Sequence, residues 1–201
     1  MTRSSTTATV AVAILLFSVA ACAGNRSGVV YFSNFTAGYD PHSLSAAMSR
    51  APLLVETFGL PAAGLAQQNL SRTTALALRQ HGSPWLPRNY TDSAVDAANG
   101  PYRLRIAYAA PKGFDSQLLC GTAMDTAALD AARRESDAES SRTVASLCRG
   151  QTAIGIAEGS PGANPDVSGE SFGRFVGALG REVMPRRNPV LDDDCQFRFC
   201  D

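Results

Sequence analysis

The clearest alternation of apolar and polar residues along the chain lies between Tyr102 and Ala109. Because successive side chains of a strand point to opposite faces, this pattern predicts a strand with one core face and one polar face. Further strands are predicted for four shorter apolar runs: residues 28–35, 52–58, 142–148 and 152–158. The last two flank Arg149-Gly150-Gln151, a spacing that is typical of a hairpin.

A helix is predicted for residues 61–80. Pro61 stands near its first turn, no later proline interrupts it, and His81-Gly82 is a typical C-terminal stop. Its apolar side would carry these side chains: Ala66, Leu70, Thr73 and Ala77, with Leu76 beside them. The loop that follows is rich in proline and contains Trp85, the only tryptophan of the chain.

Two more helices are predicted further along the chain. Residues 125–135 are rich in alanine and can be capped by Asp125 or Thr126. Residues 168–184 end before Pro185. This last helix has an apolar stripe at helical spacing: Phe172, Phe175, Val176, Leu179 and Val183.

Glycine recurs along the last predicted helix, at Gly169, Gly173, Gly177 and Gly180. Each interior glycine costs a helix about 1 kcal/mol relative to alanine. We therefore predict a compensating gain from close approach of this helix backbone to a sheet or to another helix. The alternative is a face that docks a partner.

The order of these elements indicates an α+β fold. We expect an antiparallel or mixed sheet of about four to five strands, covered by two main helices and stapled by disulfides. A chain of 201 residues, 45% hydrophobic, has room for one domain after removal of a leader, so residues 29–201 are expected to form a single domain. Eighteen basic and 18 acidic residues cancel, which argues against a nucleic-acid partner.

Residues 1–21 have the pattern of a signal peptide. A single positive charge at Arg3 and a start rich in Ser and Thr precede an almost entirely apolar run from Ala8 to Ala21. A membrane-spanning helix needs about 20 apolar residues, and this run is shorter. Cleavage, rather than permanent insertion, is therefore expected.

The apolar run ends in Val19-Ala20-Ala21-Cys22, which resembles the lipobox of bacterial lipoproteins. The resemblance implies that the thiol of Cys22 receives a diacylglyceryl group, that acyl chains such as palmitate anchor the protein in the bilayer, and that cleavage makes Cys22 the N-terminus. Residues 22–28 would then be a tether, and the domain would face the periplasm. In this family Ala rather than Asp after the cysteine, here Ala23, goes with the outer membrane.

A different cleavage is also compatible with the leader. Ala21-Cys22-Ala23 fits the small-x-small site of an ordinary secretory signal peptide. Cleavage there would release a soluble secreted protein. Either cleavage leaves four cysteines for the exported domain.

These four cysteines, Cys120, Cys148, Cys195 and Cys200, are an even number in an exported domain and predict two disulfides. Three pairings are possible. We favour Cys120 with Cys148 and Cys195 with Cys200, because the last two can close a short local loop; the other two pairings stay open.

Residues with catalytic chemistry are few and scattered. His42 and His81 have no Cys or His neighbour at ligand spacing, and Lys112 is isolated. The chain contains no nucleophile elbow, Ser-x-x-Lys, zinc-protease or phosphate-loop motif. The acidic run Asp192-Asp193-Asp194 lacks the spacing of a calcium loop and is explained by a solvated turn. We therefore predict no catalytic, cofactor or metal site.

The expected protein is an envelope lipoprotein that serves as a non-enzymatic binding or assembly accessory, with the bilayer and an envelope protein as partners. Its leader and cysteines resemble those of small proteobacterial lipoproteins of unassigned activity, a likeness that implies location only. One alternative is a periplasmic hydrolase that uses residues gathered from loops: Asp40, His42, His81 and Lys112. Another is a small-molecule binding module with Trp85 as an aromatic wall.

Overall fold

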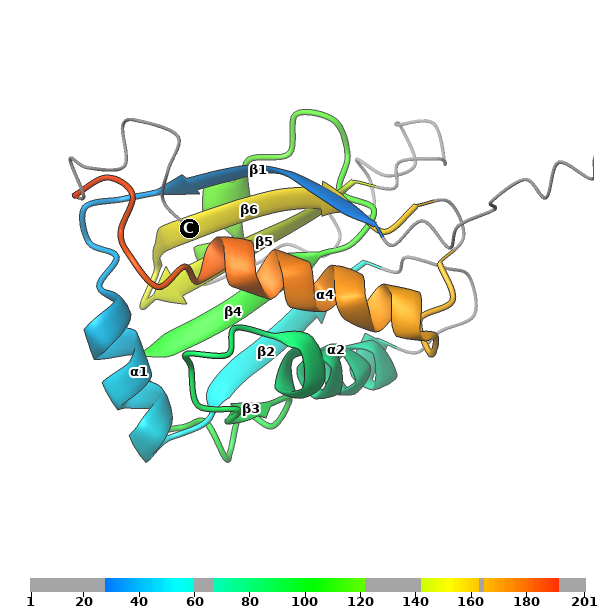
Figure 1. Ribbon diagram of the computed structural model, residues 1–201. Coiled ribbons are helices and arrows are strands. Elements are labelled where there is room, and N and C mark those ends of the chain that lie inside the picture. Colours follow the sequence, from blue (N-terminus) through cyan, green and yellow to red (C-terminus); the bar gives the residue numbers. More distant parts are fainter. Residues whose placement is uncertain (1–27, 60–66, 122–141, 163–164, 192–201) are drawn as a thin grey trace, which may run out of the picture.

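One mixed sheet organises the described part of the chain, residues 28–59, 67–121, 142–162 and 165–191, in this computed structural model. Its strands have these bounds: β1 (Val29–Phe35), β2 (Leu53–Phe58), β3 (Tyr90–Thr91), β4 (Tyr102–Ala107), β5 (Thr143–Arg149) and β6 (Thr152–Ser160). They lie in the order β1-β6-β5-β4-β2-β3 (Figure 1).

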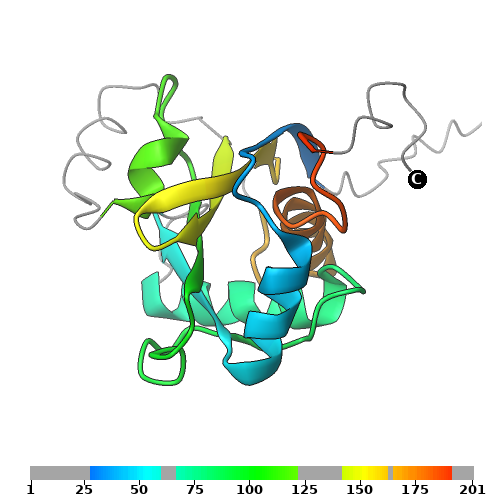
Figure 2. The same cartoon turned by 90° about the vertical axis from the view of Figure 1, so that its left-hand side faces the viewer.

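Helices lie on both faces of the sheet and at one end. Their bounds are α1 (Pro41–Arg50), α2 (Gln67–His81) and α4 (Glu170–Val183), with a 3-10 helix η1 (Ser116–Cys120). Figure 1 shows α2 and α4 side by side over one face, with α1 at the end of the sheet. Figure 2 shows η1 on the opposite face. The α+β prediction is confirmed.

The sheet combines two kinds of pairing. β1, β6, β5 and β4 are antiparallel neighbours, whereas β2 runs parallel to both β4 and β3. The mixed alternative is therefore correct, and the predicted hairpin is the β5–β6 pair. The sheet has one strand more than expected, because β3 pairs over only Tyr90 and Thr91 and is too short to show alternation in the sequence.

The main core lies between the sheet and the α2–α4 layer. It contains the predicted apolar stripe of α4, from Phe172 to Val183, and the core face of β4. Tyr108, directly after β4, lies with its ring 5.7 Å from that of Phe172, and its hydroxyl is 3.0 Å from the hydroxyl of Thr74 on α2. Burial raises the pKa of Tyr108, so this hydroxyl stays protonated within its hydrogen bond.

The glycines of α4 allow α2 to pack closely against it. A Cβ atom on Gly177 would lie 2.4 Å from the Cβ and from the carbonyl oxygen of His81, at the end of α2. One on Gly180 would lie 2.5 Å from a methyl group of Leu78. The predicted close approach is confirmed, with α2 as the neighbour. Gly169 has a different role, because it is the N-cap of α4.

The second face of β4 carries the predicted polar side chains Arg103 and Arg105, but most of it is covered. Arg105 is 6% exposed, and Ala107 is fully buried. η1 covers this face, with Leu119 packed against Ala107 and Val144 in a second, smaller core. The sequence did not predict this cover, because a helix of one or two turns produces no periodic signal in the sequence.

Two helices differ from the pattern-based expectation. The sequence pattern predicted no helix at residues 41–50, where the structure has α1. The buried side of α2 runs through Leu70, Thr74 and Leu78 rather than through Thr73, while Leu76 is 45% exposed. Residues 61–66 and the predicted helix 125–135 lie outside the described residues.

None of the helices in the described ranges has the length and apolarity needed to cross a bilayer.

Candidate functional site

The predicted Cys120–Cys148 disulfide is present. It joins the end of η1 to β5, and both cysteines are fully buried, with 5.4 Å between their Cα atoms. The sulfur atoms sit in a small apolar cluster with Ala153 and Ile156 of β6. Cys22, Cys195 and Cys200 lie outside the described residues, so the second pairing stays a prediction.

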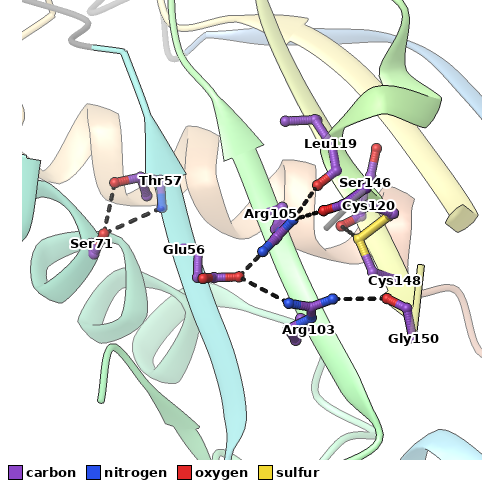
Figure 3. Close-up of polar contacts among 11 residues, drawn as sticks. Glu56, Thr57, Ser71, Arg103, Arg105, Leu119, Cys120, Ser146, Cys148 and Gly150 are labelled. Carbon is purple, nitrogen blue, oxygen red and sulfur yellow. Dashed lines mark hydrogen bonds and ion pairs between the residues drawn. A yellow bond between two sulfur atoms is a disulfide. The ribbon is translucent and has the colours of Figure 1, made fainter. Parts of the chain in front are cut away.

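A buried arginine lies beside this disulfide (Figure 3). Arg105 donates from Nε to a carboxylate oxygen of Glu56 at 2.6 Å, and from Nη1 to the carbonyl oxygens of Leu119 at 2.7 Å and Gly121 at 2.8 Å. Its guanidinium carbon is 5.7 Å from the centre of the Phe58 ring. The charge of Arg105 is therefore compensated on several sides.

These contacts make the arginine a structural connection between strand and 3-10 helix. A charge buried to this degree is tolerated only with a counter-ion and well-placed hydrogen bonds. Glu56 on the adjacent β2 provides the counter-ion, and the two carbonyl groups belong to the backbone on either side of Cys120. The cluster holds the disulfide-bearing segment against the sheet and presents no unpaired reactive group.

The candidate pair Asp40 and His42 begins α1. Asp40 is the N-cap: its carboxylate accepts from the backbone N–H of His42 at 3.0 Å and from the hydroxyl of Ser43 at 2.5 Å. These bonds, that of the Ser43 side chain first, lower the pKa of Asp40. The contact between Asp40 and His42 involves the backbone of the histidine and not its imidazole, so it is a helix cap.

The other candidates lie on different parts of the fold. His81, at the end of α2, packs against α4, whereas Lys112 is exposed in the loop that leads into η1, the helix on the opposite face of the sheet. Trp85 is half-buried against the main core, as a packing residue would be. The four proposed hydrolase residues are therefore not brought together into a nucleophile and base pair.

One open pocket brings basic side chains together. It has a volume of about 470 Å³ and lies between the end of α2, one side of α4 and the chain just before β1. Its lining residues are Gly28, His81, Arg174, Ala178 and Arg181. Arg174, Ala178 and Arg181 are four and then three residues apart, which places them on one side of the helix.

Hydrogen bonds hold the basic side chains of this pocket. Arg174 donates to the Glu170 carboxylate, one turn earlier on α4, at 2.5 Å, and Arg181 donates from Nη1 to the carbonyl oxygen of His81 at 2.6 Å. The hydrogen bond and the charge of Arg174 lower the pKa of Glu170, with a smaller contribution from His81. The arrangement can bind an anion, and none of its lining residues carries a hydroxyl or a thiol.

Sequence reasoning missed this pocket. The helical spacing of Arg174 and Arg181 was visible in the chain, but their meaning depends on His81, which is far away in the sequence. Only the packing of α2 on α4 brings the three side chains together. No group of three His, Cys, Asp or Glu side chains arranged for a metal occurs within the described ranges, and Asp192-Asp193-Asp194 lies outside them.

Comparison with known proteins found no match: no family model, no curated protein sequence and no solved structure is similar to this chain.

Proposed function

We propose that this protein is an envelope lipoprotein, anchored through acyl chains on Cys22, whose α+β domain acts in binding or assembly and not in catalysis. The observation that carries the proposal is the leader, which ends in Val19-Ala20-Ala21-Cys22. The outer membrane is the favoured location, because Ala23 follows the acceptor cysteine. A secreted soluble protein is the alternative.

The disulfide supports export from the cytoplasm. Disulfides form and persist in oxidising compartments such as the bacterial periplasm, and thiols elsewhere in bacteria are mostly kept reduced. The Cys120–Cys148 bond is buried within the fold and links η1 to β5, so the fold uses it as a structural element. Such a bond suits a domain that faces the periplasm.

The start of the folded domain also fits a short tether. β1 begins at Val29, seven positions after Cys22. An extended chain spans about 3.3 to 3.6 Å per residue, so this tether would keep the domain within roughly 25 Å of the acylated cysteine. A domain held so close to the membrane is suited to contacts with lipids and with other anchored proteins.

The scattered candidates favour a binding role. Asp40 is a helix cap, Lys112 is exposed in the loop before η1, and His81 packs against α4. The basic pocket beside His81 has the chemistry of anion binding. A hydrolase would need a base within hydrogen-bond reach of a nucleophile.

Metabolic labelling tests the anchor. Cells that express the full chain are grown with an alkyne analogue of palmitate, and the membrane and soluble fractions are compared. We expect label on the wild-type protein in the membrane fraction and none on Cys22→Ser. A wild-type protein that is unlabelled and recovered from the soluble fraction contradicts the proposal and favours the secreted alternative.

A further inference from the structure

The basic pocket lies where the chain enters the folded domain. Gly28, the first described residue, forms part of its wall, and Cys22 precedes it by six positions. Even a fully extended chain between the two spans only about 20 Å. If Cys22 carries the anchor proposed above, the pocket is within reach of the lipid headgroups around that anchor.

The charges around the pocket favour an anion. Three basic residues, Arg174, Arg181 and His81, line it, and Glu170 pairs with Arg174. Within the described part of the chain Arg181 has no carboxylate partner, and its bond to the His81 carbonyl uses only Nη1. The remaining N–H groups of a guanidinium fork match two oxygens of a phosphate.

The shape leaves room for a phosphate and its substituents. Gly28 and Ala178, the two non-basic residues of the lining, carry little or no side chain, and the volume is about 470 Å³. Val29, the next residue along β1, is 64% exposed. An apolar side chain is therefore accessible to solvent next to the basic pocket.

We propose that this pocket binds the phosphate of an anionic phospholipid headgroup in the membrane that holds the acyl anchor. The inference rests on the proposed lipidation of Cys22. It assigns the pocket a ligand and also gives the domain an orientation. The C-terminal end of α2 and the side of α4 that carries Arg174, Ala178 and Arg181 face the bilayer. The β5–β6 hairpin, at the other end of β6 from Gly28, points away.

Arginine footprinting tests this orientation on the native, acylated protein. The protein is extracted from membranes and reconstituted in phosphatidylcholine vesicles with or without phosphatidylglycerol, and arginines are modified with phenylglyoxal and located by peptide mass mapping. We expect Arg174 and Arg181 to react about five-fold more slowly in the vesicles with phosphatidylglycerol. Arg149, in the hairpin, is the matched control and should react equally in both.

A third sample distinguishes a lipid headgroup from soluble phosphate as the ligand of the pocket. The protein is held in uncharged detergent micelles, with or without inorganic phosphate. The inference is supported if phosphatidylglycerol protects the two arginines, if high salt removes that protection, and if inorganic phosphate protects them little in micelles. Equal protection by inorganic phosphate in micelles overturns it in favour of a soluble ligand.

The same peptide maps report on the anchor itself. Acyl chains on Cys22 together with unprotected Arg174 and Arg181 overturn the headgroup site but leave the proposed function intact. A Cys22 without acyl chains overturns the anchor and, with it, the headgroup site.

Discussion

Gly177 and His81 are in contact so close that no side chain fits between them: a Cβ atom on the glycine would lie 2.4 Å from the Cβ of the histidine. This contact sets the distance between α4 and the end of α2. It thereby brings His81 into the same pocket as Arg174 and Arg181, so the glycine pattern of α4 and the basic pocket have a common structural cause.

Gly177→Ala should destabilise the protein, although alanine is the better helix former. The added methyl group meets backbone and Cβ atoms of His81, which cannot move without displacing α2, and such overpacking costs about 1 to 3 kcal/mol. Gly173→Ala is the matched control. Its methyl group would meet only the tip of the His81 ring, at 3.1 Å, so the helix preference of alanine should leave stability unchanged or raised by up to about 1 kcal/mol. Urea unfolding compares the two, and equal losses would show that the close approach is not specific to Gly177.

Replacing Cys120 and Cys148 together by alanine should lower the free energy of unfolding by about 3 to 4 kcal/mol. The bond closes a loop between residues 28 positions apart, and its loss restores the entropy of that loop in the unfolded chain. Urea unfolding of oxidised wild-type protein and of the variant measures the difference. Unchanged stability would mean that η1 is held on the sheet by its other contacts alone.

Glu56→Gln should cost about 2 kcal/mol, because it leaves the buried Arg105 without its counter-ion. The carboxylate is partly exposed, which keeps the cost below that of a fully buried pair. Arg103→Gln is the control: its contact with Glu56 is 4.0 Å long and lies nearer the surface, so the expected loss is under about 1 kcal/mol.

In a double-mutant cycle, Glu56→Gln with Arg105→Gln should cost less than the sum of the single changes. Additive losses would rule out a direct coupling.

Asp40→Ala should cost about 1 kcal/mol at neutral pH through loss of the α1 cap. Hydrogen bonds in the folded state lower the pKa of Asp40 below its ordinary value of 3.8. The charged cap therefore stabilises the protein fully above pH 3.8. This contribution is lost as the pH falls through the lower pKa of the folded state. The difference between wild type and Asp40→Ala, measured by thermal unfolding across this range, should therefore shrink toward acid pH. Asp40→Asn keeps a hydrogen-bond acceptor that does not titrate, so its stability relative to Asp40→Ala should not vary with pH. If the stability of the wild type relative to Asp40→Ala were also constant with pH, the charge of Asp40 would have no role.

The sequence predicted the elements that have long periodic patterns. β4 alternates over its whole length, and the stripe of α4 repeats from Phe172 to Val183, about three turns, so both were located with their core faces. The close packing of α4 followed from the cost of its glycines. The Cys120–Cys148 bond was favoured among three pairings, because Cys195 and Cys200 are close enough in the sequence to close a local loop. In each case a local rule was sufficient.

The features that were missed depend on short elements or on distant contacts. α1 buries only Leu44 and Met48, which is too few for a periodic pattern, although Asp40-Pro41 is a typical helix start. η1 spans only five residues, too few for a periodic pattern. Its contact with Arg105 joins residues 14 positions apart and depends on how the chain folds back onto the sheet. The basic pocket requires the packing of α2 on α4, which no local pattern contains.

The most direct test of the account is the intact mass of the unreduced protein extracted from membranes, compared with that of Cys22→Ser. The account predicts a chain that begins at Cys22, is heavier by its acyl groups and is lighter by two hydrogens for each disulfide, with no acyl mass on Cys22→Ser. A wild-type chain that begins at Gly24 and carries no lipid would contradict the anchor and identify a soluble secreted protein.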